Sequence, residues 1–149
     1  HDVMPRIRTD GAGSGGAGPG DSLSLRFYAM GAYEVYPPPI GPGPERFDGC
    51  WINNTGVQQT ITGVSIEQRK TGDTVLNVGS TVVDVRVNGV SIFGVNPLPT
   101  LTTPGVDGQS DTKLVFATPI VPVGAKVETI LVSNQTGGRR DLTAIVTMT

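Results

Sequence analysis

The chain has 149 residues, with 11 lysines and arginines against 13 aspartates and glutamates, and a net charge of −2. This balance argues against a nucleic-acid-binding protein, which needs a clustered basic face. No apolar run approaches the roughly 20 residues that cross a bilayer, so we expect a protein that is soluble when it is made and has no membrane partner.

Two residue counts argue against an enzyme. The only histidine is His1 and the only cysteine is Cys50, so neither a Ser-His-Asp nor a Cys-His arrangement can form inside the chain. One cysteine also permits no internal disulfide. We therefore expect a noncatalytic protein without cofactor or bound metal.

Residues 1–20 predict a flexible N-terminal arm. Residues 11–20 are nearly all glycine and alanine, the composition of a flexible linker. The segment before them, residues 3–8, alternates apolar and cationic side chains. We expect it to bind a neighbouring subunit, with apolar contacts and carboxylate pairing from Val3, Met4, Arg6, Ile7 and Arg8. The alternative is a dangling tail that contributes nothing.

The first strand is expected at residues 22–28, where leucine and phenylalanine alternate with polar residues. A proline-rich segment follows at residues 37–44, with five prolines in eight residues, which favours extended polyproline II. It is either a stiff connection or a partner-binding segment. In the second case, the binding residues are Tyr33, Tyr36, Pro37, Pro38 and Pro39.

Residues 80–93 predict a β-hairpin. Apolar and polar residues alternate on both sides of Asn88-Gly89, the pair that a type I′ turn prefers. The alternation places the valines at 83, 85 and 87 on the core face and puts Asp84 and Arg86 on the solvated face.

The remaining strands follow at short, regular spacing, separated by segments rich in Gly, Asn, Asp and Pro. We expect them at residues 46–53, 60–68, 81–87, 90–93, 113–117, 126–133 and 142–148. Ile61 and Val64 are out of phase while Val64 and Ile66 agree, so a bulge is expected at Gly63. Residues 21–149 therefore predict one all-β domain, a jelly-roll-like antiparallel β-sandwich of about eight strands.

Several polar or reactive side chains have ordinary structural interpretations. Asp107 and Asp111 flank a short loop, but two carboxylates fall short of the six to eight oxygen ligands of calcium. Glu67 and Asp84 follow the pattern of solvated strand faces, where ion pairs with nearby arginines are expected.

Three other features also have structural interpretations. Cys50 and Trp51 are expected in the core. The sequons at Asn53 and Asn134 are chance matches. Arg139 and the arginine after it form either a solvated hairpin tip or a contact for an acidic partner surface.

Residues 57–149 resemble a small β-sandwich module of tailed-bacteriophage structural proteins, found in capsid decoration (cement) and fibre proteins. Four motifs carry the resemblance: the hairpin at residues 83–93, a proline-leucine segment at 97–101, residues 120–127, and a last strand beginning at Asp141. These are fold-shaping motifs and point to architecture more than to activity.

The resemblance implies a virion surface protein, commonly a homotrimer, that binds the major capsid protein and neighbouring copies of itself. We expect a capsid decoration protein that stabilises a phage head from its outer surface, and that is soluble in the host cytoplasm before assembly. The alternative is a receptor- or carbohydrate-binding module of a tail fibre. Sugar sites usually expose aromatic rings, and this chain has only eight, which weakens that alternative.

Overall fold

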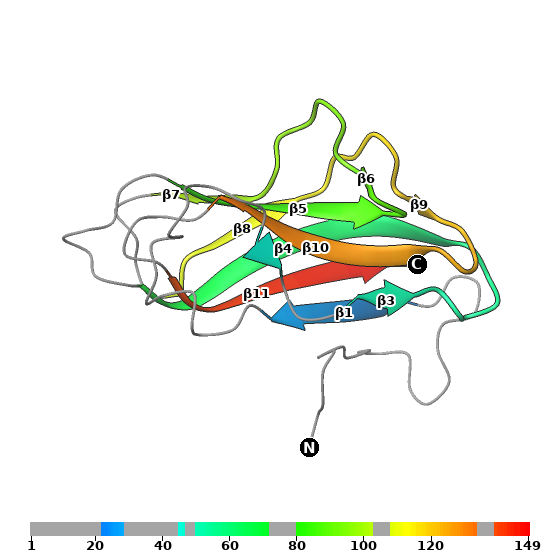
Figure 1. Ribbon diagram of the computed structural model, residues 1–149, viewed down its shortest axis with the longest axis horizontal. Coiled ribbons are helices and arrows are strands. Elements are labelled where there is room, and N and C mark those ends of the chain that lie inside the picture. Colours follow the sequence, from blue (N-terminus) through cyan, green and yellow to red (C-terminus); the bar gives the residue numbers. More distant parts are fainter. Residues whose placement is uncertain (1–21, 29–44, 47–49, 72–79, 103–107, 134–138) are drawn as a thin grey trace, which may run out of the picture.

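The computed structural model describes residues 22–28, 45–46, 50–71, 80–102, 108–133 and 139–149 (Figure 1). Side chains are described throughout these ranges except at 45–46, 69–71 and 139–141. Within the described ranges the regular elements are all strands, and no helix occurs. The prediction of an all-β fold is confirmed.

One sheet has five antiparallel strands. Its hydrogen-bonded order is β1 (Leu23–Tyr28), β11 (Arg139–Met148), β4 (Gln59–Thr71) and β8 (Ser110–Lys113), and the short β9 (Ile120–Val121) also pairs with β4.

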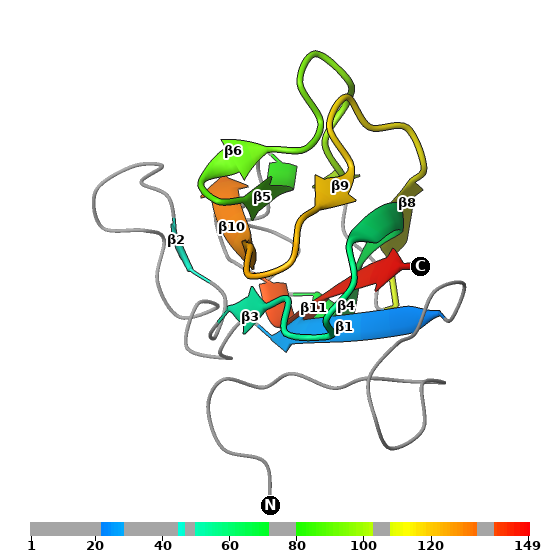
Figure 2. The ribbon, with the colours of Figure 1, turned by 90° about the vertical axis from the view of Figure 1, so that its right-hand side faces the viewer.

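The second sheet has six antiparallel strands. Its order is β2 (Glu45–Arg46), β10 (Lys126–Ser133), β5 (Ser80–Val87) and β6 (Val90–Ser91). The short β3 (Trp51–Ile52) pairs with β10, and β7 (Thr100–Thr102) pairs with β5. Figure 2 shows the two sheets facing each other, with β6 and β9 at one edge of the sandwich and β1 and β3 at the other.

The strand order is that of a jelly roll. Three pairs of short strands each take the place of one jelly-roll strand: β2 with β3, β6 with β7, and β8 with β9. Counted in this way along the chain, the domain has eight strand positions. The first then pairs with the eighth, the second with the seventh, the third with the sixth and the fourth with the fifth. This is a long antiparallel ribbon folded over into two sheets, the double Greek key. The predicted jelly-roll-like sandwich is confirmed.

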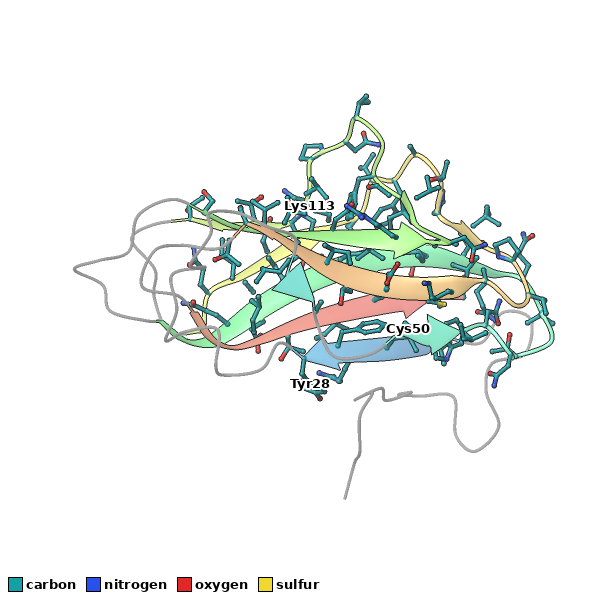
Figure 3. The ribbon with its side chains drawn as sticks, in the orientation of Figure 1. Tyr28, Cys50 and Lys113 are labelled. Atoms are coloured by element: carbon teal, nitrogen blue, oxygen red, sulfur yellow. The ribbon has the colours of Figure 1, made fainter. Side chains whose placement is uncertain are left out.

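The core lies between the sheets because each strand sends alternate side chains inward. In β1, Leu23, Leu25 and Phe27 are fully buried, while the intervening residues, including Tyr28 at its end (Figure 3), are half-buried. Facing side chains from the other strands complete the core; they include Val64, Ile66, Val83, Val85, Val127, Leu131, Ala144, Val146 and Met148.

The predicted hairpin and bulge are both confirmed. Asn88 and Gly89 have φ angles of 50° and 83°, as a type I′ turn requires. In β4, Gly63 pairs with Thr147 while Ile61 pairs with Met148, so Thr62 is the extra residue. The bulge allows Ile61 and Val64 to face the same core although three positions separate them.

Four expectations need correction. Residues 114–117, expected to form a strand with Lys113, form none, because the strand here is β8, which ends at Lys113 (Figure 3). The strand expected at 46–53 is two short strands that both pair with β10. Cys50 and Trp51 are half-buried, with Trp51 packed against the core from its margin. Asp84 is only 5% exposed and is more buried than the half-buried Val87, so the prediction that Asp84 lies on a solvated face was wrong. The reason lies in the contacts of Asp84 described next.

Candidate docking surface

Two connections lie side by side at the edge of the sandwich that carries β6 and β9 (Figures 1 and 2). Residues 92–99 join β6 to β7, and residues 114–119 join β8 to β9. The main-chain nitrogens of Ala117 and Thr118 both donate to the carbonyl of Ile92, at 2.8 and 3.0 Å. These bonds replace a strand ladder at Ala117, which is why the expected strand stops at Lys113. We call the two connections the loop pair.

Packing also ties the loop pair together. The rings of Phe93 and Phe116 lie 5.4 Å apart in a tilted arrangement, with Phe93 fully buried. Gly94 has a φ of +61°, and a Cβ at this position would lie 2.7 Å from the Cβ of Ala117. Glycine is required here for both its φ angle and the close approach of the two connections.

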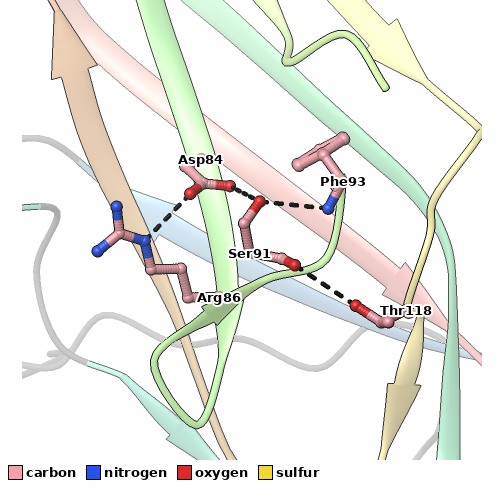
Figure 4. Close-up of polar contacts among 5 residues, drawn as sticks. All are labelled: Asp84, Arg86, Ser91, Phe93 and Thr118. Atoms are coloured by element: carbon pink, nitrogen blue, oxygen red, sulfur yellow. Dashed lines mark hydrogen bonds and ion pairs between the residues drawn. The ribbon is translucent and has the colours of Figure 1, made fainter. Parts of the chain in front are cut away.

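The base of the loop pair rests on Asp84 (Figure 4). The Asp84 carboxylate accepts a hydrogen bond from Ser91 Oγ at 2.7 Å and pairs with Arg86 Nε at 3.0 Å. Ser91 Oγ in turn accepts from the main-chain nitrogen of Phe93 at 3.2 Å, and the Ser91 carbonyl accepts from Thr118 Oγ1 at 3.4 Å. Asp84 can be buried because both of its oxygens have partners, and its bond to Ser91 fixes the residue that precedes the loop at 92.

The surface of the loop pair is apolar. Neither connection contains a charged residue. Their two polar side chains bond main-chain carbonyls: Thr118 bonds Ser91, and Asn96 Nδ2 donates to Phe93 at 2.9 Å. Val95 is fully exposed, and Leu114 and Val115 are 69% and 64% exposed. Exposed apolar patches are typical of protein interaction sites.

The strands next to the loop pair extend this character. Val90 of β6 and Ile120 of β9 are both exposed. Lys113 and Asp111, just before Leu114, are paired with each other at 3.4 Å, and Asp111 also accepts from the main-chain nitrogen of Thr100 at 2.7 Å. Asp111 therefore links β8 to β7 across the edge of the sandwich and stabilises the fold there. Asp107 lies outside the described residues.

A second irregular segment, residues 53–57 after β3, is built differently from the loop pair, and we call it the Asn53 turn. Asn53 is fully buried, and its amide nitrogen donates to the carbonyls of Val57 and Val121, each at 3.0 Å. Its amide oxygen accepts from Thr55 Oγ1 at 2.7 Å. A buried, bonded amide is no glycan acceptor, in agreement with the interpretation of this sequon as a chance match. Asn134 lies outside the described residues.

Within the part of the chain that the structure describes, no group of three or more His, Cys, Asp or Glu side chains is placed to hold a metal ion. No helix in that part is long and apolar enough to cross a membrane. Glu67 is exposed on the outer face of β4, opposite Ser110. The side chain of its expected partner, Arg69, is not among those described.

The partner-binding residues predicted from the sequence all lie outside the described residues: Val3, Met4, Arg6, Ile7, Arg8, Tyr33, Tyr36, Pro37, Pro38 and Pro39. They remain predictions. Sequence reasoning missed the loop pair because residues 114–117 form a short apolar run, which is also typical of a buried strand. One signal was available: residues 87–106 and 114–125 contain no charged residue.

No family model and no curated protein matches the chain. Among solved structures, the chain is similar to a family 35 carbohydrate-binding module from Clostridium thermocellum, with 14% identity and a TM-score of 0.33. The match covers 96% of this chain and 89% of that one. At this TM-score the similarity supports no conclusion about a ligand.

Proposed function

We propose that the protein is a noncatalytic capsid decoration protein, which docks on the outer surface of a phage head and stabilises it. The observation that carries the proposal is the loop pair, where Val95, Leu114 and Val115 face solvent on connections that are held together by hydrogen bonds and aromatic packing. Exposed apolar side chains weaken solubility without adding to the core, so a contact with another protein explains them best.

The fold is compatible with this role but does not decide it, because jelly rolls serve many functions. The sequence resemblance of residues 57–149 to phage decoration and fibre modules supports the choice. The chemistry supports it as well, since the chain has no internal histidine and its described part offers no acidic cluster for a metal.

The arm is the second contact in this proposal. Residues 3–8 bind a neighbouring subunit while the loop pair binds the shell, and several such contacts in a homotrimer raise the effective concentration of each. A shell clamped at several points resists expansion and loss of subunits without any chemical step.

Electron cryomicroscopy of intact virions tests the location. We expect density for the sandwich on the outer surface of the head, with the edge that carries β6 and β9 facing the shell. Density at the tail tip would contradict the proposal and favour the receptor- or carbohydrate-binding module of a tail fibre.

Co-sedimentation with heads stripped of this protein tests the binding. The full chain should pellet with the heads and raise the temperature at which they open. A chain that stays in the supernatant and leaves the heads unchanged would contradict a decoration role.

A further inference from the structure

The loop pair limits the kind of partner that can cover it. Its two connections carry no charge, and Asn96 and Thr118 bond main-chain carbonyls at the base of the loops. What it offers a partner is mostly apolar: the side chains of Val95, Leu114 and Val115, alongside the hydroxyl of Thr118, which is also exposed.

The charged residues that come shortly before the two connections in the sequence have partners within the domain. Asp84 is buried and bonded to Ser91 and Arg86, and Lys113 is paired with Asp111. A charge on a partner surface would therefore lose its water over the loop pair without gaining an opposite charge, a strongly unfavourable exchange. An apolar partner surface would lose only unfavourable contact with water.

We infer that the loop pair binds an uncharged, apolar patch of a coat-protein subunit, and that hydrophobic contact rather than ion pairing holds the two together. This inference rests on the proposed function, since it names the surface that the decoration protein meets. The expected contact has Val95 at its centre, because Val95 is the most exposed of the three side chains.

Salt dependence distinguishes this contact from an electrostatic one. The probe is the full chain with Arg6→Gln and Arg8→Gln, which keeps the arm but removes its two guanidinium groups, titrated onto stripped heads. The dissociation constant should change by less than about twofold between roughly 50 and 500 mM NaCl, because screening acts only on charge pairs. Sodium sulfate should tighten binding, because it strengthens apolar association. A dissociation constant that rises about tenfold or more over that range would overturn the inference.

Charge insertion gives a second, independent readout. Val95→Asp should weaken head binding by at least about tenfold, since it buries a carboxylate against an apolar patch. The matched control is Val132→Asp, the same change at an exposed valine of β10 outside the loop pair, which should bind like the wild type. Unchanged melting temperatures for both variants show that neither result reflects unfolding.

The outcomes separate the two proposals. Equal binding by Val95→Asp and the wild type would overturn the docking role of the loop pair while leaving decoration in place. A wild-type chain that does not bind heads at all would overturn decoration, and with it the partner assigned here.

Discussion

The loop pair and the Asn53 turn are both irregular segments of the same sandwich, but they are built in opposite ways. Asn53 is fully buried, and its amide nitrogen donates to the carbonyls of Val57, Val121 and Pro122. The loop pair is held by main-chain bonds to Ile92 and by packed rings, and it turns Val95 toward water. The first arrangement serves stability. The second fixes the shape of a surface whose apolar side chains contribute nothing to the core.

The largest loss of stability is expected at the Asn53 turn. Asn53→Ala removes the donor to three carbonyls, those of Val57, Val121 and Pro122, and the acceptor for Thr55, so several buried polar groups lose a hydrogen bond. We expect the free energy of unfolding to fall by about 3 kcal/mol, on the scale of such losses. Urea unfolding followed by tryptophan fluorescence measures it. At temperatures where the variant is folded, head binding should be unchanged, and a selective loss of binding would contradict the comparison.

Gly94→Ala tests the close approach within the loop pair. The added Cβ meets Ala117 at 2.7 Å and the φ of +61° is unfavourable for alanine, so we expect a loss of about 2 kcal/mol. The matched control is Gly56→Ala, which has a φ of +84° but open space around the new Cβ, and should lose only about 1 kcal/mol. Equal losses in the two variants would mean that the two connections are not tightly apposed.

Asp84→Asn tests the base of the loop pair. The amide oxygen can still accept from Ser91, but the pairing with Arg86 is lost, so we expect a loss of about 1 kcal/mol. Amide hydrogen exchange at Phe93, Ala117 and Thr118 should become faster than at residues in the middle of β4. Exchange that accelerates evenly across the domain would show that Asp84 has no special link to the loop pair.

The smallest effect on stability is expected at the tip. Val95→Ser should leave the free energy of unfolding unchanged, since Val95 is fully exposed, yet it should weaken head binding several-fold by removing apolar contact. Thermal unfolding and co-sedimentation on the same samples measure the two quantities. Loss of stability without loss of head binding would mean that Val95 supports the fold and not the contact with a partner, which would contradict this prediction.

The sequence predicted the parts of the fold that depend on local pattern. Alternation located β1, β5, β10 and β11, and Asn88-Gly89 and Gly63 marked the turn and the bulge. Each of these signals depends on neighbouring residues, because strand period and positive φ are local properties.

The parts that were missed depend on contacts between distant residues. Asp84 is buried by Ser91, which the hairpin brings back onto β5. Residues 114–117 form a short apolar run like that of a strand, but Ala117 bonds Ile92 in place of a sheet neighbour. The short β7 and β9 lie between prolines and carry too few residues to show a period. The loop pair depends on contacts between residues 92–99 and 114–119, which no local sequence pattern indicates.

The pairing of β1 with β11 has a consequence for how the domain forms. Leu23 lies opposite Met148, and Phe27 lies opposite Ala144, so residues near the two ends of the chain are direct neighbours. Contacts over such sequence separations make folding slow, because a long loop must close before any stabilising contact forms. During synthesis, β1 leaves the ribosome long before β11 exists and exposes Leu23, Leu25 and Phe27 until the last strand arrives. The sheet that holds β1 is therefore completed only after β11 has been made, and truncation within β11 should leave β1 unpaired and prone to aggregation.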